Sequence, residues 1–365
     1  MKTKPPSNAV TLTVNGRIHG GWTAASIETA LTSLSNAFTI EVTDGNPAKL
    51  DFAIARGDAC SLAIGGTTLL TGWVDDVEIA YDGQSHGITI RGRDKTGDLV
   101  DCSALMTGTG RWDRTSVMAI AKDLLAPYGI TVSSTTPDTG KVMDSHAIQM
   151  GESVWECLDR ALRQYGVMAM ADGNGNLVLT RPGDAGARAE LRLGGTILAG
   201  QAQYSGRETF RDYYVLGQFP GSGDAYADPR VTTMASAQAS DPNVKRYRPL
   251  IVFTEANTAD MSFLPTRAAW EAAVRSGRGE TFSVTVAGWR DSGGNLYAPN
   301  TLVRIEDDFL RVHETLLVSG VRLELGEGGQ LAHLTLGRKE AFLPAPVTEL
   351  PPYDPATGRT AGGAP

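Results

Sequence analysis

Alternating apolar and polar residues form two similar hairpin patterns, one in each half of the chain. Residues 69–94 and 316–339 each begin with a Leu-Leu pair and continue with apolar residues about two positions apart, namely Val74, Val77 and Ile79, and Val321, Leu323 and Leu325. A Gly-containing turn, a return strand (88–90 or 334–336) and a Gly-Arg ending follow in both. Period-two alternation closed by a Gly turn is typical of an antiparallel hairpin with one buried face. The sequence therefore predicts two copies of one β module, which favours symmetric assembly over catalysis.

Further alternating runs predict one compact β domain over residues 8–105, after a flexible N-terminal tail at 1–7. Asn15-Gly16 separates two short strands and is typical of a type I′ turn. More strands are expected at 26–28, 38–42, 50–54 and 60–64. A small barrel is the simplest arrangement, because a closed sheet leaves few exposed edges.

Helical periodicity predicts a small α/β domain over residues 106–190. One helix is expected to begin at Thr115 or Ser116 and to end at Pro127. A second is expected to end near Gly166, with one apolar stripe formed by Val154, Leu158, Leu162 and Tyr165. Two strands joined by a Gly-Asn turn follow directly, so this domain is predicted to pack two helices against a hairpin.

Alternation returns over residues 191–345 and predicts a second β-barrel, with a helical insertion near 262–277. Its strands are expected at 212–219, 249–253, 281–289, 302–305 and 309–318, followed by the second copy of the hairpin. Residues 346–365 are rich in Pro, Gly and Ala and bury little apolar surface, so a flexible tail is predicted. The expected fold class is mainly β with α+β portions: two related antiparallel β-barrels and a small α/β domain.

Composition supports a globular, β-rich protein. The chain has 365 residues, a length typical of two or three domains, with a hydrophobic fraction of 41% and 42 Gly residues that favour many turns. The net charge of −8 disfavours a dedicated nucleic-acid binder, because phosphate contacts need clustered Lys and Arg. It is compatible with a surface past which DNA slides. No signal peptide and no apolar window long enough to span a membrane is visible, so neither export nor membrane insertion is expected.

The residue types that carry catalysis or bind metals do not form a convincing pattern. Cys60, Cys102 and Cys157 match no metal-binding spacing and are expected to be buried thiols in a reducing cytoplasm. The five His residues are scattered, and no serine-hydrolase or nucleotide-binding motif is present. Asp172, Asn174 and Asn176 resemble the start of an EF-hand, but Leu177 and Gly183 stand where that loop needs Gly and Glu, so a hairpin turn is favoured. No enzyme activity, cofactor or metal is predicted.

Several charged and aromatic residues near strand ends are candidates for contacts between subunits. Asp75 and Asp76 could suggest a glycosidase pair, but neighbouring strand residues point to opposite faces, which argues against it. Trp22, Trp73 and Trp289 each follow a Gly and fit core packing better than a carbohydrate platform. The candidate subunit or tube-docking contacts are Trp73, Asp75, Asp76, Arg91, Arg93, Arg290 and Arg338.

The layout of the whole chain resembles a known family. The segments that carry the resemblance are VTLTVNGRIHGGW, ESVWECLDRALRQYGVMAMADGNGNLVLTRPG, RAAWEAAVRSGRGETFSVTVAGW and GGNLYAPNTLVRIEDDFLRVHETLLVSGV. Their order and spacing over residues 8–345 are similar to those of the baseplate hub proteins of Mu-like contractile-tailed phages. Related modules occur in the hub part of other phage baseplates and in type VI secretion spike proteins.

This resemblance implies a structural protein of the virion, assembled in the host bacterial cytoplasm. It implies a homotrimeric ring with two barrels per chain, which adapts the hexameric tail tube to a trimeric central spike and leaves a channel through which DNA passes without specific binding. Other expected partners are the baseplate wedge proteins and the tape-measure protein. The alternatives are a siphophage-type distal tail protein and a tail-associated module that binds carbohydrate or degrades peptidoglycan.

Overall fold

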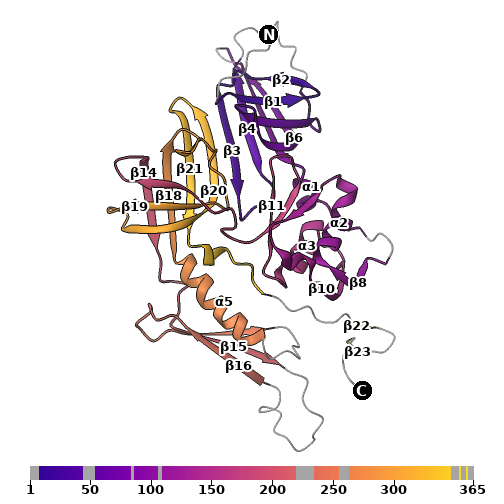
Figure 1. The fold of residues 1–365 in the computed structure, drawn as a ribbon. Helices are drawn as coiled ribbons and strands as arrows, with labels where there is room; N and C mark the ends of the chain where they lie inside the picture. The colour runs from indigo at the N-terminus through magenta and orange to yellow at the C-terminus, as the bar shows by residue number, and fades with distance from the viewer. Residues whose placement is uncertain are drawn as a thin grey trace, which may run out of the picture.

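The fold is that of a computed structural model, which describes residues 8–43, 54–83, 86–105, 109–218, 234–254, 263–346, 353–354 and 359–360. The described part of the chain is mainly β. Most of its strands form one large sheet of 13 strands, with the order β14-β18-β21-β20-β3-β4-β7-β6-β5-β1-β2 and with β13 and β19 joined beside β20. Figure 1 shows the long strands of this sheet side by side, with the helices to one side and at one end.

Six strands from the first quarter of the chain form a first β unit. They are β1 (Val10–Val14), β3 (Ala24–Ala30), β4 (Ala37–Thr43), β5 (Ala59–Ile64), β6 (Thr67–Tyr81) and β7 (His86–Asp94). The short strand β2 (Arg17–His19) pairs with β1 across Asn15 and Gly16, whose φ values of 51° and 76° confirm the predicted tight turn. Strand β6 pairs with β7 as the first predicted hairpin.

Six later strands form a second β unit. They are β13 (Ala187–Arg192), β14 (Ile197–Tyr204), β18 (Glu280–Ala287), β19 (Leu302–Asp307), β20 (Val312–Gly326) and β21 (Gly329–Gly337). Strands β20 and β21 pair as the second predicted hairpin. The two hairpins have the same dimensions, because each joins a strand of 15 residues to one of nine.

The two β units have equivalent strand orders and registers. The order β3-β4-β7-β6-β5-β1 in the first corresponds to β14-β18-β21-β20-β19-β13 in the second. Each long strand contains a bulge, after Val74 in β6 and after Val318 in β20. Matching the bulges gives a constant difference of 244 in residue number, which also pairs Phe38 with Phe282 in the neighbouring strands. The predicted duplication is therefore present in the topology.

The equivalence of the two units is limited in two details. The Gly-Arg endings are not equivalent, because Gly337 corresponds to Arg93 rather than to Gly92. The last strands also differ: β13 runs parallel to β19, whereas β1 runs antiparallel to β5. The backbone register, rather than the likeness of the endings, decides which residues correspond.

The two units share one sheet and one hydrophobic core. Strand β3 pairs antiparallel with β20, with Ile27 opposite Leu323, so hydrogen bonding continues from one unit to the other. Both side chains are buried, at 1% and 3% exposed. A single core cluster contains residues of both units, including the equivalent rings Phe38 and Phe282. The two units are therefore joined by backbone hydrogen bonds between strands and by a shared hydrophobic core.

A small α/β domain follows the first unit and has its own core. Helix α1 (Gly97–Asp101) leads into it, and the helices α2 (Val117–Leu125) and α3 (Val154–Arg163) pack around buried residues such as Leu124 and Leu158. Its strands are β8 (Arg111–Ser116), β9 (Val132–Ser134), β10 (Val142–Ala147), β11 (Met168–Ala171) and β12 (Leu177–Thr180). Two 3₁₀ turns, Ala126–Tyr128 and Pro137–Gly140, lie between them.

Local signals set the ends of these helices, and the start of α2 is where the sequence predicts it. Helix α2 begins after Ser116, whose hydroxyl accepts a hydrogen bond from the Ala119 N–H, and ends at Leu125, two residues before Pro127. Ser153 and Glu156 form a complete capping box at the start of α3. The hairpin β11–β12 turns at Asp172, whose carboxylate accepts bonds from the Asn174 and Asn176 N–H groups, so the hairpin-turn interpretation is confirmed.

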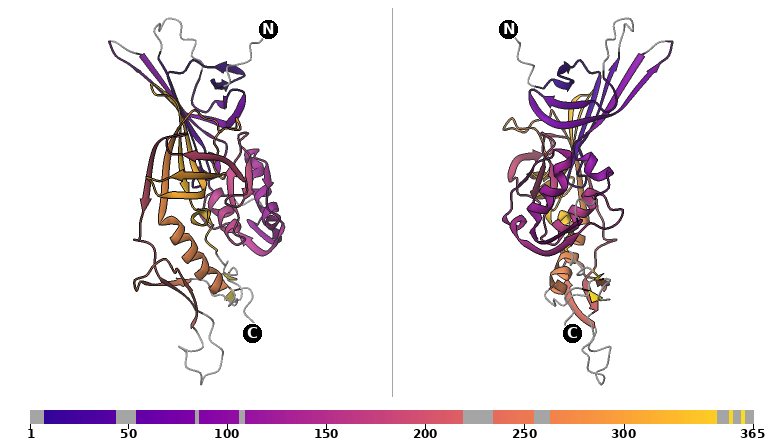
Figure 2. Two further views of the ribbon diagram at one scale, coloured as in Figure 1. Left: turned by 60° about the vertical axis from the view of Figure 1, so that its left-hand side comes forward. Right: turned by 90° about the vertical axis from the view of Figure 1, so that its right-hand side faces the viewer.

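A third structural part interrupts the second β unit between β14 and β18. Strands β15 (Asp212–Gln218), β16 (Met234–Ser240) and β17 (Pro249–Thr254) form a separate sheet that packs against helix α5 (Phe263–Arg278). The insertion is therefore larger than the predicted helix, and the strands expected at 212–219 and 249–253 lie outside the large sheet. Figure 2 shows this part at the end of the molecule opposite the first strands.

The chain end packs on α5. After a 3₁₀ turn at Lys339–Phe342, the carbonyls of Leu343 and Pro346 accept hydrogen bonds from Trp270 and Arg267 of α5. The short strands β22 (Tyr353–Asp354) and β23 (Arg359–Thr360) pair with each other. The predicted tail at 1–7, most of the predicted tail at 346–365 and most of the strand expected at 50–54 lie outside the described residues.

The burial of the cysteine and tryptophan side chains agrees only in part with the prediction. Cys60 and Cys157 are buried, and burial raises the pKa of the Cys60 thiol to about 12. Cys102 is exposed, so its predicted burial is wrong. Trp289 is buried, but Trp73 is 36% exposed, because β6 turns this side chain away from the core.

Candidate assembly surfaces

One face of the large sheet is polar across both β units. In successive strands, Thr285, His333, Arg322 and Glu28 lie directly opposite one another. A parallel row continues from Glu324 through Ser26, Thr39 and Arg91 to Asp76. The core side chains alternate with these residues and point to the other face, as the period of two in a strand requires. The polar face is therefore a continuous surface built by both units.

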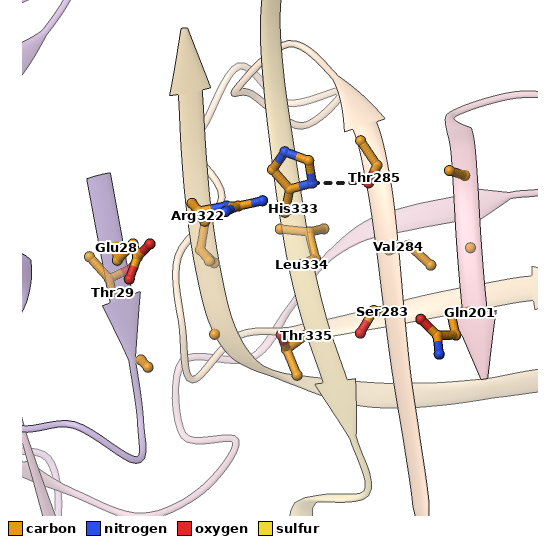
Figure 3. A pocket seen from close by; sticks show the side chains of 15 residues that line it. Glu28, Thr29, Gln201, Ser283, Val284, Thr285, Arg322, His333, Leu334 and Thr335 are labelled. Carbon is orange, nitrogen blue, oxygen red and sulfur yellow. Dashed lines mark hydrogen bonds between the residues drawn. The ribbon is translucent and has the colours of Figure 1, made fainter. Parts of the chain in front are cut away.

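The polar face is hollowed at the junction of the two units. A hollow of about 610 Å³ is lined by residues of β3, β14, β18, β20 and β21. Figure 3 shows Glu28 and Arg322 on one side of it, with His333 beside Thr285 and Gln201 farther along. His333 is bonded at both ring nitrogens, with Nδ1 3.0 Å from the Thr285 hydroxyl and Nε2 3.0 Å from the Glu324 carboxylate. Arg322 lies 3.6 Å from the same carboxylate, so Glu324 is paired with both Arg322 and His333.

The hairpin β6–β7 carries five of the seven predicted contact residues. Arg93 binds Asp75 at 2.8 Å and Asp101 at 2.7 Å, and these hydrogen bonds raise the pKa of Arg93. The same ion pair lowers the pKa of Asp101. Trp73 lies opposite Arg93, and Asp76 lies opposite Arg91. The structure therefore brings Trp73, Asp75, Asp76, Arg91 and Arg93 together on one surface.

The bulge in β6 overturns one sequence argument about these residues. Asp75 and Asp76 were expected on opposite faces because they are neighbours in a strand. The bulge between Val74 and Asp76 breaks the alternation, and both carboxylates lie on the face of Arg91 and Arg93. The argument against a carboxylate pair is therefore wrong, although Asp75 is held in an ion pair with Arg93.

The other two predicted contact residues lie elsewhere. Arg290 is hydrogen bonded to the Asn8 side chain at 3.3 Å and to the Gly294 carbonyl at 2.9 Å. Arg338 binds Glu280 at 3.0 Å and Glu314 at 3.4 Å in the second unit. Both side chains hold parts of their own chain together, so the structure does not join them to the hairpin cluster.

Two buried carboxylates are structural residues that the sequence did not indicate. Asp94 is 1% exposed and accepts hydrogen bonds from the Asn36 and Thr96 N–H groups, so it ties the loop before β4 to the start of the α/β domain. Glu271 is 2% exposed and pairs with Arg267 and Arg275 on α5. The i,i+4 spacing of Glu271 with both arginines is the only sequence signal for this arrangement.

The described residues form neither a metal cluster nor a membrane span. No group of three or more His, Cys, Asp or Glu side chains within them could hold a metal ion. None of the helices in the described part has the length and apolar character needed to cross a membrane.

Comparison with known proteins gives matches along most of the chain. The family described as Mu phage baseplate assembly protein GpP-like, N-terminal, matches residues 9–94. The second domain of baseplate hub protein gp44-like matches residues 96–181, and the fourth domain of GpP matches residues 259–345. The baseplate hub protein gp44 of Escherichia phage Mu is 33% identical over 344 residues, which cover 92% of this chain and 89% of that protein.

Solved structures agree with these matches. The 43 kDa tail protein of prophage MuSo2 from Shewanella oneidensis has a TM-score of 0.82 and 31% identity, over 92% of this chain and 99% of that one. The E. coli c3393 protein, a component of the type VI secretion system, has a TM-score of 0.57 over 93% of this chain and 80% of that one. At 11% identity, this last likeness concerns the fold alone.

The chain is mainly β, contains two equivalent units and is similar to phage tail proteins. It is therefore a structural protein of a phage tail. The sequence resemblance stated above is thereby confirmed. The chain belongs to the family of Mu-like baseplate hub proteins. Its role is structural, in the baseplate of the virion, among other tail proteins.

Proposed function

We propose that three copies of this chain form a ring with pseudo-sixfold symmetry, which joins the hexameric tail tube to a trimeric central spike. The observation that carries the proposal is the equivalence of the two β units in strand order and register. Three chains with two such units each present six similar surfaces to a hexameric partner. The α/β domain and the insertion around α5 occur once per chain, so the ring carries three of each. A closed ring also limits assembly to a defined size, as point-group symmetry requires.

The channel of this ring is lined by the polar face of the large sheet. Its two rows combine the neutral Thr285, Ser26 and Thr39 with charges of both signs, among which Glu324 is bound to His333 and Arg322, and the chain carries a net charge of −8. Strong phosphate binding needs several uncompensated Lys or Arg side chains, which release counterions when DNA binds. A neutral to acidic polar wall therefore lets DNA pass without holding it.

The parts of the chain take different roles in the baseplate. The β segments at 8–105 and 191–345 build the ring, apart from the insertion around α5. That insertion and the α/β segment at 106–190 lie outside the ring, where the wedge and spike proteins can bind. The tail tube and tape-measure proteins meet the ring along its axis. Assembly takes place in the host cytoplasm, before the virion is released, and no enzymatic step is part of this role.

Native mass spectrometry with negative-stain imaging tests the proposal. A mass of three chains at micromolar concentration and rings with six similar lobes are expected, because each interface of a stable ring buries more than about 1,000 Å². A stable monomer would contradict the ring, and three lobes would contradict the pseudo-sixfold arrangement. Co-sedimentation of the ring with purified tail-tube protein would then test the docking.

A further inference from the structure

The small sheet of the insertion carries apolar side chains on the face away from α5. Helix α5 packs on the face that holds Val252 of β17, and Figure 1 shows α5 beside β15 and β16. Side chains alternate along a strand, so Ile251 and Phe253 of β17 point to the other face, beside Tyr214 and Leu216 of β15. Ile251 and Phe253 are 57% and 68% exposed. Adjacent exposed apolar side chains of this kind mark contact surfaces.

Strand β17 is also an open edge of this sheet. The strand order is β16-β15-β17, so β17 has β15 as its one neighbour among the described strands. The Arg248 carbonyl, just before β17, accepts a hydrogen bond from the Arg211 N–H on the β15 side at 2.8 Å. Backbone groups alternate in direction along a strand, so those of Pro249, Ile251 and Phe253 point to the open side. Proline in a sheet is confined to such edges, and unpaired backbone groups are a template for another strand.

Basic residues gather at the start of this edge. Lys245, Arg246 and Arg248 lie within five residues of the first residue of β17. Lys245 and Arg248 donate hydrogen bonds to backbone carbonyls, and none of the three is paired with a carboxylate of the described residues. The chain as a whole has a net charge of −8, so this cluster is a local excess of positive charge. Such a patch attracts and orients an acidic partner.

We propose that β17 binds an extended acidic segment of another tail protein as an added strand. The segment pairs with the open edge, places apolar side chains beside Ile251 and Phe253, and carries carboxylates at the end next to Lys245, Arg246 and Arg248. Strand addition of this kind takes its affinity from backbone hydrogen bonds and its specificity from alternate side chains. The inference concerns the insertion alone, so it goes beyond the proposed ring and does not depend on it.

A protein strand suits this surface better than a nucleic acid does. Single-stranded nucleic acids bind by stacking their bases on aromatic rings within a basic groove. Here the rings nearest the basic cluster already hold arginines, with Arg248 over Phe210 at 4.9 Å and Arg211 over Tyr247 at 5.8 Å. The unpaired backbone groups and the aliphatic Ile251 are matched by a strand. We place the partner antiparallel to β17, the commoner pairing, which puts its acidic end at its C-terminus.

Fluorescence anisotropy with a defined peptide tests the inference on the full chain. The labelled peptide TVTVTVEEE alternates apolar and polar residues, ends in carboxylates, and should bind with a Kd of about 100 μM or less. The peptide TEVTEVTEV has the same composition and charge without the alternation, and should bind at least about tenfold more weakly. Hydrogen exchange at the N–H groups of Ile251 and Phe253 should slow when the first peptide binds, because those groups become paired.

A charge-reversal variant tests the basic cluster. Lys245→Glu with Arg246→Glu places like charges beside the acidic end of the peptide, and should weaken binding of TVTVTVEEE at least about tenfold. Raising the salt concentration should weaken binding to the wild type more than binding to this variant, because salt screens the attraction. The matched control is Lys122→Glu, an exposed position on α2, which should bind the peptide like the wild type.

Two further variants test the strand edge. Ile251→Pro removes an N–H from the open side without breaking a bond to β15, and should reduce binding at least about tenfold. Phe253→Ser removes the exposed ring and should weaken binding about threefold or more while circular dichroism stays unchanged. Val142→Ser is the matched control for loss of an exposed apolar side chain, because Val142 is 60% exposed on β10, and it should bind normally.

The outcomes separate this inference from its alternatives and from the ring. No binding of TVTVTVEEE at about 1 mM, equal binding of both peptides, or full binding by Ile251→Pro would overturn strand addition. Tighter binding of a ten-nucleotide oligothymidylate, lost in the Lys245→Glu and Arg246→Glu variant, would overturn it in favour of a nucleic-acid site. Dissociation of the oligomer in Phe253→Ser, seen by native mass spectrometry, would instead assign this face to a contact between copies. A monomeric wild type that binds the peptide would contradict the ring and leave this inference standing.

Discussion

Replacing Asp94 tests how the first β unit is fastened to the α/β domain. The carboxylate is 1% exposed and accepts hydrogen bonds from the Asn36 N–H at 3.0 Å, the Thr96 N–H at 3.1 Å and the Thr96 hydroxyl at 2.5 Å. Asp94→Ala leaves these donors without their acceptor. Each unsatisfied buried donor costs about 1–3 kcal/mol, so we expect a loss of about 3–5 kcal/mol in the free energy of unfolding. That is a large share of the roughly 5–15 kcal/mol that stabilises a typical domain.

The matched variant Asp94→Asn separates hydrogen bonding from charge. It keeps the shape and one acceptor oxygen, so a smaller loss of about 1–3 kcal/mol is expected. Loss of hydration raises the pKa of Asp94 in the folded protein, against the smaller opposing effect of its hydrogen bonds. An acid with a raised folded pKa binds more protons when folded, so its contribution to stability falls as pH rises from its ordinary value through the raised one. The stability gap between wild type and Asp94→Asn should therefore be larger at pH 4 than at pH 7.

Urea unfolding followed by circular dichroism at the two pH values measures this gap. Other carboxylates titrate equally in both proteins, so the difference isolates position 94. Asp101→Asn serves as a control of opposite sign, because Arg93 lowers the pKa of Asp101 and its contribution is lost as pH falls. A gap at position 94 that grows from pH 4 to pH 7 would refute the reasoning, since it would mean that hydrogen bonds outweigh the loss of hydration.

Three further predictions concern the equivalent cores and the helices. Phe38→Ala and Phe282→Ala should each cost about 3–5 kcal/mol in urea unfolding, because both rings are buried at equivalent places; tolerance of either one would contradict the equivalence. Glu271→Ala leaves two arginines of α5 without their buried partner and should cost about 2–4 kcal/mol in thermal unfolding, whereas an unchanged transition would contradict the buried role. Ser153→Ala removes the side-chain cap of α3 and should cost about 1 kcal/mol, while Ser153→Thr should cost less; equal losses would argue against the capping box.

Features that depend on neighbouring residues were predictable from the sequence. The hairpin β6–β7 follows from alternation and a short turn, and the cap of α3 follows from Ser153 and Glu156. The turn at Asp172 was predictable because its carboxylate can accept hydrogen bonds from the backbone N–H groups two and four residues later, those of Asn174 and Asn176. In each case the pattern and the structure lie within one short segment, so no distant contact can overrule them.

Strand β14 was not predicted individually, because its sequence carries a weak signal. Its core-side positions include Gly200 and Ala202, and most of its side chains are exposed in the single chain. The apolar alternation that identifies a strand reflects burial, and this strand has a neighbour on only one side.

The candidate site was predictable only in part. Arg91 and Arg93 share a face because they are two residues apart in a strand, and this period is visible in the sequence. That Asp75 and Asp76 join them depends on the bulge after Val74, which shifts the alternation by one residue. A bulge is set by how two strands fit together, so the sequence of one strand does not reveal it.

The sequence by itself determined the two hairpins, the helices and their caps, the Gly turns and the resemblance to baseplate hub proteins, because each of these rests on local spacing or on the order of segments. Only the tertiary structure decided that β3 pairs with β20, and that β4, β6 and β7 correspond to β18, β20 and β21 with a constant difference of 244 residues. Pairing between strands separated by nearly 300 residues is selected by the combined fit of their backbones and their shared core. No local pattern contains that information, because register is a relation between two segments.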